Sequence, residues 1–500
     1  MKVVLVHVKE NFTPVPPSGL LYVGTMLKGD GHDVRIFDVN IKEKEGIIKK
    51  IKEIDPDVIG FSAMTTSYSI TRDFNKELKK EVPYAYYCWG GVHATAMSIE
   101  TIKENGLDFL IYGEGEFTMA EVCRRIKQKK IAQEPGVSLE GIDGVYYVEN
   151  GEVKKNSARA FIEDLDSLPI PDRSLLENFK WYLSPPGILR GRFRYGITTM
   201  YASRGCPYQC IFCASKIIHG SAIRRRSVDN VLREMEYLKD NFGVTGIYFN
   251  DDTFATDVKW LEEFCNKLKA GNLKMIWGCQ TRANIAQSLD ILKIMKKAGC
   301  RQVDIGCESG SDKILQNLKK GITANMILKS FANLKALKMT TFATFILGNP
   351  GERSDDVART REVAKMAPGG VSFLILVPYP GSPLFKMALD NKWFLNQNNI
   401  VFDERWTNKQ SDSPVMQASF RAEDLVKIRA RLQNEFFFRN NIPTILSFLK
   451  SPYFLYRAFI TIAGHPLFIL NSIKKAVKKR KLMDFLEDIY QKFNEDLRRC

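Results

Sequence analysis

Two series of short β-rich runs, alternating with segments of helical length, occupy most of the chain. The first series covers residues 1 to about 130 and contains the runs KVVLVHV, HDVRIFDV, DVIGFSA, AYYCWGG and DFLIYGEGE. The second begins near residue 195 with the runs GITTMYAS, GIYFNDD, MIWGCQT, QVDIGCES, TFATFILG and VSFLILVPY. Strands that alternate with helices form parallel sheets covered by helices. Because the loops after such strands meet at one edge of the sheet, we expect the binding residues there.

The two series predict an α/β protein with two main domains. A doubly wound, Rossmann-like domain covers residues 1–156 and ends in the run VYYVENGEVKKN, which predicts a hairpin with an Asn-Gly turn. A proline-punctuated linker follows over residues 157–194, and six strand-helix units over residues 195–385 predict a partial (β/α)6 barrel. The strand periodicity then stops, so we expect residues 386–500 to form a helical C-terminal region.

The stretch RGCPYQCIFCAS, residues 204–215, holds Cys206, Cys210 and Cys213, three of the ten cysteines. Uneven cysteine spacing with one tight cluster favours metal or redox chemistry in a reducing cytoplasm over a disulfide scaffold. A closed zinc site needs a fourth nitrogen or sulfur ligand, and the nearest histidine, His219, lies outside the spacing of short zinc motifs. Three thiolates on a cubane iron-sulfur cluster leave one iron open to a substrate or cofactor. A zinc or purely structural iron-sulfur site is the alternative.

The C-x3-C-x2-C spacing, with Phe212 before the last cysteine, resembles the signature of the radical S-adenosylmethionine (SAM) enzymes. The later runs ESGS, ILGNPGE and PYPGSPL are similar to further motifs of that superfamily in order and spacing. The N-terminal runs PPSGLLYVG, GGVHAT and GEGE resemble the cobalamin-binding domain of its B12-dependent branch, which includes class B methyltransferases and the anaerobic magnesium-protoporphyrin ester cyclase. The resemblance covers roughly residues 1–385.

The resemblance implies a 4Fe-4S cluster on the three cysteines, with SAM chelated by the fourth iron and cleaved by one electron from a ferredoxin or flavodoxin. The SAM-binding residues that it implies are Phe212, Asp251, Asp252, Arg282, Glu308, Ser309 and Gly348. Asp251 and Asp252 stand where the family often has a glutamate, which is a departure. Glu308 and Ser309 are equally explained as a cap of the next helix, and Arg282 as the partner of a neighbouring acid.

The resemblance also implies bound cobalamin. The residues predicted to contact it are Gly19, Thr65, Thr66, Ser67, Gly90, Gly91, His93, Gly113, Glu114, Gly115 and Glu116. The loop after the first strand, KENFTPVPPSG, lacks the histidine of the D-x-H-x-x-G loop that supplies an axial ligand in other cobalamin domains. A corrinoid here would therefore not be ligated by that histidine. His93 in GGVHAT is more often a hydrogen-bonded loop residue than a metal ligand.

The resemblance implies a cobalamin-dependent enzyme that methylates an unactivated carbon, with a radical cyclase acting on a lipid or porphyrin as the alternative. Two other classes are alternatives. In a tRNA-modifying enzyme the net charge of +16 would serve to bind phosphates. The resemblance disfavours nucleic acid, because tRNA-modifying members of the superfamily carry three further N-terminal cysteines for a second cluster and only Cys88 and Cys123 precede the cluster here. A non-catalytic iron-sulfur carrier is disfavoured because its cluster usually has four protein ligands, whereas this motif supplies three.

The C-terminal sequence bears on substrate and location. The apolar run SPYFLYRAFITIAGHPLFIL, residues 451–470, carries Arg457 and is followed by the basic run NSIKKAVKKRK. Its uncharged part is too short to span a bilayer, so it predicts an interfacial anchor with basic flanks or, equally, an amphipathic helical subdomain. Since the N-terminus does not resemble a signal peptide, we expect a cytoplasmic enzyme, peripheral to the inner membrane face, that acts on a hydrophobic small molecule or lipid.

Overall fold

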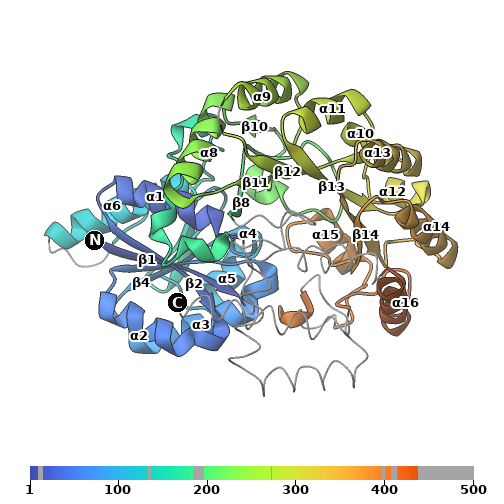
Figure 1. Ribbon diagram of the computed structural model, residues 1–500. Coiled ribbons are helices and arrows are strands. Elements are labelled where there is room, and N and C mark those ends of the chain that lie inside the picture. Colours follow the sequence, from blue (N-terminus) through green and yellow to red (C-terminus); the bar gives the residue numbers. More distant parts are fainter. Residues whose placement is uncertain are drawn as a thin grey trace, which may run out of the picture.

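The computed structural model describes residues 1–9, 15–132, 137–183, 196–271, 273–396, 400–406 and 414–436 (Figure 1). Two sheets, each with its own helices, lie side by side, the N-terminal one in blue and cyan and the second in green to brown. The predicted membrane-facing run over residues 451–481 lies outside the described residues. In the part of the chain that the structure describes, no helix combines the length and apolar character needed to cross a membrane.

The N-terminal sheet has the strand order β2-β1-β3-β4-β5-β6-β7. Its strands are β1 (Lys2–Lys9), β2 (Asp33–Asn40), β3 (Val58–Ser62), β4 (Tyr86–Gly90), β5 (Phe109–Ile111), β6 (Val145–Glu149) and β7 (Glu152–Lys155). The first five are parallel, and the predicted hairpin β6–β7 adds two antiparallel strands at the edge. Because β1 pairs with both β2 and β3, the order reverses there, and ligands of such sheets bind at this switch point.

Helices cover both faces of this sheet because the strands are apolar on both sides. The helices are α1 (Ser18–Gly29), α2 (Lys44–Ile54), α3 (Tyr68–Glu81), α4 (Val92–Ala96), α5 (Ser98–Glu104) and α6 (Glu116–Ala132). Along β1, Val3 and Leu5 pack toward α1 and α6, whereas Val4 and Val6 pack in the cluster that contains Phe74 of α3. This alternation is the doubly wound arrangement predicted from the sequence.

The second sheet is fully parallel, with the order β15-β14-β13-β12-β11-β8. Its strands are β8 (Ile197–Met200), β11 (Gly246–Phe249), β12 (Ile276–Thr281), β13 (Cys300–Glu308), β14 (Phe342–Leu347) and β15 (Gly370–Ile375). The helices of this domain are α7 (Lys216–His219), α8 (Val228–Phe242), α9 (Val258–Ala270), α10 (Ala283–Ala286), α11 (Leu289–Lys297), α12 (Asp312–Asn317), α13 (Ala324–Ala336), α14 (Ser354–Lys365), α15 (Pro383–Asp390) and α16 (Ala422–Glu435). The sequential order and the outer ring of helices are those of the predicted partial (β/α)6 barrel (Figure 1).

Three short segments complete the frame around the site. The connector forms the 3-10 turns η3 (Leu165–Ser167), η4 (Arg173–Leu175) and η5 (Phe179–Tyr182), with Phe179 and Tyr182 buried in the same apolar cluster as β1 and α8. A two-residue antiparallel ladder joins β9 (Ser203–Arg204) to β10 (Arg224–Arg225). The cysteine stretch lies between these two short strands, on the loop that follows β8.

Candidate active site

A cavity of about 580 Å³ lies between the two domains. Glycines at the carboxyl ends of the N-terminal strands form one wall, together with α1. The facing wall carries polar residues at the carboxyl ends of β8, β11 and β12, namely Tyr201, Ser203, Arg204, Asn250, Asp251, Asp252 and Gln280. The cavity therefore joins the ligand-binding edges of two parallel sheets, which is where ligands of both fold types bind.

Seven of the eleven residues predicted to contact cobalamin line this cavity, namely Gly19, Gly90, Gly91, Gly113, Glu114, Gly115 and Glu116. Gly91 has a φ of +92° and a side chain there would meet the Ala63 carbonyl oxygen at 3.0 Å, so only glycine fits this turn without strain. Glycine walls leave backbone exposed to a large flat ligand. The glycines of this wall would let a flat corrin ring approach the backbone closely.

The other four predicted cobalamin residues are absent from the cavity wall. Thr65, Thr66 and Ser67 form the turn η2 (Thr65–Ser67), and Thr65 Oγ1 lies 3.1 Å from Nδ1 of His93. The His93 ring is 1% exposed and packs at 4.3 Å from the Tyr68 ring and 4.8 Å from the Phe402 ring. Burial lowers the pKa of His93 to about 3, so this histidine is a neutral part of an aromatic cluster.

The three cysteines of the cluster motif lie half-buried on one loop. Burial raises the pKa of Cys206 and, with smaller contributions from Asp252 and the other two thiols, raises the pKa of Cys213 to about 11. The Arg282 guanidinium stacks on the Tyr208 ring at 3.5 Å, and its Nη1 lies 3.6 Å from Sγ of Cys210. Such thiols become thiolates when a metal displaces their protons.

The donor set of this loop fits a 4Fe-4S cluster with three protein ligands. The other six described cysteines, Cys88, Cys123, Cys265, Cys279, Cys300 and Cys307, are all buried. Within the described ranges no three cysteine, histidine or acidic side chains are grouped as ligands of a single metal ion. In a cubane each thiolate binds its own iron, so three thiolates on one loop would hold such a cluster through three of its four irons.

Two of the predicted SAM-binding residues, Asp251 and Asp252, lie between the cavity and the cysteine loop. Asp251 accepts hydrogen bonds from the Ala202 N–H at 2.9 Å and from Oγ of Ser203 at 2.5 Å, and burial raises its pKa to about 6. Asp252 accepts a hydrogen bond from Oγ of Ser215 at 2.6 Å. Since Ser215 follows Cys213 by two positions, this contact links the end of β11 to the cysteine loop.

A second group of predicted SAM-binding residues is connected through Lys320. Its Nζ lies 2.6 Å from the Glu308 carboxylate and 5.8 Å from the centre of the Phe212 ring, and its carbonyl accepts a hydrogen bond from Arg282. Glu308 is 5% exposed and has a φ of +62°. A left-handed backbone is unusual for glutamate and costs energy that the surroundings must offset. The buried ion pair with Lys320 holds this carboxylate at the end of β13.

Ser309 and Gly348 are placed differently. The Ser309 hydroxyl lies 3.1 Å from Oγ1 of Thr360 and accepts the N–H of Ser311 at 3.1 Å, and the residue is fully buried. Gly348 has a φ of +82°, and its N–H donates to the Glu352 carboxylate at 2.6 Å. Both residues shape the turns that follow β13 and β14. Ser309 is therefore a local hydrogen-bonding residue, whereas the N-cap of the next helix, α12, is Ser311.

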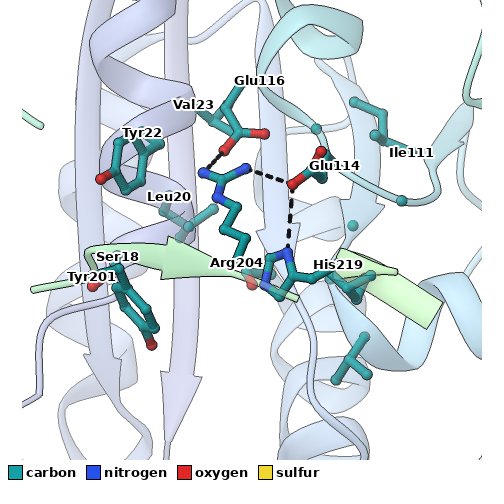
Figure 2. Close-up of a pocket in the computed structure, with 18 of the residues that line it drawn as sticks. Ser18, Leu20, Tyr22, Val23, Ile111, Glu114, Glu116, Tyr201, Arg204 and His219 are labelled. Atoms are coloured by element: carbon teal, nitrogen blue, oxygen red, sulfur yellow. Dashed lines mark hydrogen bonds and ion pairs between the residues drawn. The ribbon is translucent and has the colours of Figure 1, made fainter. Parts of the chain in front are cut away.

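The sequence did not single out the partners of the GEGE loop. Figure 2 shows Arg204 between Glu116 and Glu114, with His219 on the far side of Glu114. Arg224 also binds the Glu114 carboxylate. Burial raises the pKa of Glu114, but His219, Arg224 and Arg204 lower it more, so the net pKa lies well below the ordinary value. The one feature of the sequence that points to these ion pairs is the presence of arginines on both sides of the cysteine stretch.

Comparisons with known proteins agree with this geometry. Residues 1–123 match the B12 binding domain family, and residues 200–364 match the radical SAM superfamily. An uncharacterized methyltransferase of Pyrococcus horikoshii is 31% identical over 435 residues, which are 86% of this chain and 89% of the relative. The anaerobic magnesium-protoporphyrin IX monomethyl ester cyclase of Cereibacter sphaeroides is 27% identical over 384 residues, which are 75% of this chain and 60% of that relative.

A solved structure shares the whole fold. The cobalamin-dependent S-adenosylmethionine radical enzyme OxsB, with aqua-cobalamin and S-adenosylmethionine bound, superposes with a TM-score of 0.71 at 17% identity and covers 99% of this chain and 79% of its own. The comparisons confirm the predicted α/β fold class, the prediction of an enzyme over an iron-sulfur carrier, and the predicted cofactor set of 4Fe-4S cluster, SAM and cobalamin. The chain therefore belongs to the radical SAM superfamily, as a methyltransferase-type enzyme of the branch that carries an N-terminal B12-binding domain.

Proposed function

We propose that this enzyme transfers a methyl group to an unactivated carbon of a hydrophobic substrate. The observation that carries the proposal is the single cavity whose walls come from both domains: a glycine-rich wall for cobalamin and a polar wall that continues into the cysteine loop. Methyl donor and radical source would then be held at one cavity between the domains. When bound, the cluster supplies the electron that cleaves SAM, and cobalamin supplies the methyl group.

The described residues divide between the two tasks. Cys206, Cys210 and Cys213 would hold the cluster, and Arg282 beside Cys210 supplies positive charge next to it. Asp251 and Asp252 would orient the amino group of SAM from the end of β11. The glycines of the N-terminal sheet would face the corrin ring. His93 is left out of this assignment because its ring is enclosed by Tyr68 and Phe402.

The apolar part of the cavity supports a hydrophobic substrate. On the side of the N-terminal domain, the lining also includes the apolar residues Leu20, Val23, Phe61, Ile111 and Met119. Apolar surface of this kind favours ligands that lose little hydration on entry. The proposed membrane face rests on the sequence of residues 451–481 alone. A liposome flotation assay with anionic vesicles tests it, and protein that stays at the bottom of the gradient contradicts it.

A radical cyclase is the second candidate, and the similarity to the magnesium-protoporphyrin ester cyclase favours it. One experiment separates the two. The protein is reconstituted anaerobically with iron, sulfide, SAM and hydroxocobalamin, reduced by flavodoxin, and incubated with a lipid extract of the host. A methyltransferase gives products heavier by one methylene unit, whereas a cyclase gives products that have lost two hydrogens. Absence of SAM cleavage by the reduced, cluster-loaded protein would contradict both.

A further inference from the structure

Two arginines face each other across the short ladder that closes the cysteine loop. In the antiparallel pair β9–β10, Arg204 stands directly opposite Arg224, and all three cluster cysteines lie in the sequence between them. Like charges directly opposite on neighbouring strands repel each other. The ladder is only two residues long, so backbone hydrogen bonds offset little of this repulsion. The loop needs an anion between the two guanidinium groups to stay closed.

The Glu114 carboxylate is that anion. Its Oε1 accepts from Nη1 of Arg204 at 2.9 Å and from Nη2 of Arg224 at 3.0 Å, and its Oε2 accepts from Nη1 of Arg224 at 2.7 Å. Glu116 binds the other side of Arg204. The side chains of Glu114, Arg204 and Arg224 are 3%, 10% and 4% exposed. Two carboxylates and two guanidinium groups therefore balance in a buried site, where an unpaired charge is strongly unfavourable.

Fixing the arginines fixes the backbone of the cysteine loop. Gly205, next to Arg204, has a φ of +90°, and a side chain there would lie 2.1 Å from the carbonyl oxygen of Ala222, so the two ends of the loop touch. Arg224 Nη2 also donates to the carbonyl of His219 at 2.9 Å. Since Cys206 follows Gly205, a displaced Arg204 moves the first cluster ligand with it.

Glu114 belongs to the other domain, on the loop between β5 and α6. Its Oε2 also accepts the N–H of Ile162 in the connector at 2.8 Å. One buried carboxylate thus ties the B12-binding domain, the connector and the cysteine loop together. We propose that Glu114 is a positioning residue for the iron-sulfur cluster: by pairing Arg204 with Arg224 it keeps the cysteine loop in its cluster-binding form while the domains are docked.

The test is the variant E114Q, which keeps the shape of the side chain but removes its charge and turns an N–H toward the arginines. The site then carries the charges of Glu116, Arg204 and Arg224, a net of +1 in place of 0. After anaerobic reconstitution, E114Q is expected to lose iron to a chelator about tenfold faster than the wild type. The midpoint potential of its cluster, measured by EPR-monitored titration, is expected to rise because a nearby negative charge is gone.

Two further variants make the test specific. E121Q removes a carboxylate of the same helix region that pairs with Arg159 in a more exposed site, and wild-type iron loss and potential are expected for it. The double variant E114Q/R224Q restores charge balance and removes the repulsion, so slower iron loss than in E114Q is expected. If E114Q does not fold, recovery of folded, cluster-loaded protein in the double variant supports the proposal, and failure to recover it overturns the proposal.

The inference rests on the proposed role of the three cysteines as cluster ligands, and the wild type tests that role separately. Wild-type protein that takes up no cluster would overturn the ligand assignment. Wild-type protein that holds a cluster, together with an E114Q variant that loses iron at the wild-type rate, would overturn only the positioning role of Glu114. Equal rates of iron loss from E114Q and E121Q would likewise overturn the positioning role of Glu114.

Discussion

At the scale of single residues, the cysteines fall into two environments. Cys206, Cys210 and Cys213 are half-buried on one loop, whereas Cys265 is buried in the apolar core of α9. We expect alanine at any of the three loop positions to abolish the cluster, measured as iron and sulfide content after reconstitution. C265A is the matched control: it should keep the full cluster and lose about 1 kcal/mol of stability, because a buried cysteine packs as a small apolar group. Cluster uptake by the loop variants would contradict the assignment.

Asp251 predicts a pH dependence of stability. Burial raises its pKa from 3.8 to about 6, so the folded protein binds this proton more tightly than the unfolded chain. The stabilising contribution is complete below pH 3.8 and is lost as the pH rises to about 6. A shift of this size corresponds to about 3 kcal/mol. Urea denaturation of wild type and D251N across this window should show a difference in unfolding free energy that changes by about that amount.

A change at Ser203 checks the same carboxylate independently. The Ser203 hydroxyl donates to the charged form of Asp251 and so lowers its pKa. S203A removes that donor, and the pKa of Asp251 is expected to rise further. The pH at which stability falls should therefore move upward in S203A. A transition that moves to lower pH, or a D251N variant with the pH profile of the wild type, would show that Asp251 does not titrate in this window.

At the scale of elements, the long strands that carry the site were predictable from the sequence. The short ladder between β9 and β10 was not. The apolar runs of β4 and β5 show where these strands end, so the glycines at and after their ends, Gly90, Gly91, Gly113 and Gly115, could be placed from the sequence. The two-residue ladder between β9 and β10 has no apolar pattern, because it is held by Arg204, Arg224 and Glu114. The sequence also could not show that the His93 ring is buried and does not line the cavity. Phe402, which packs on this ring, lies some three hundred positions away in sequence.

The turn after β14 predicts a loss of stability in G348A. Gly348 has a φ of +82°, and a side chain there would lie 2.7 Å from Cδ2 of Leu425 in α16. The left-handed backbone and the contact with α16 should together cost about 1–3 kcal/mol of unfolding free energy. G46A, in the exposed first turn of α2 with no atom within 4 Å of the new side chain, should instead stabilise by about 0.4–1 kcal/mol. Equal thermal unfolding midpoints for the two variants would contradict this reasoning.

At the scale of the whole molecule, buried charge joins parts that apolar patterning treats separately. The periodicity of apolar residues predicts each sheet, because the faces of a sheet are buried by the helices that alternate with its strands. Periodicity within each sheet carries no information on how the two sheets meet, since the contacts there include ion pairs between positions far apart in sequence, such as Glu114 with Arg224. A second such group joins the connector to the barrel: Glu234 of α8 accepts from Arg173 at 2.5 Å and also from Arg226.

The Glu234 group gives the last prediction. The side chains of Glu234, Arg173 and Arg226 are 1%, 2% and 5% exposed. Burial raises the pKa of Glu234, but the two arginines lower it more, so its net pKa stays below the ordinary value. E234A leaves two buried cations without their partner, so we expect it to lose about 3–5 kcal/mol of unfolding free energy in urea denaturation. E236A, an exposed glutamate of the same helix, should stay within about 0.5 kcal/mol of the wild type. An E234A variant as stable as E236A would mean that the connector is held to the barrel by its apolar contacts alone.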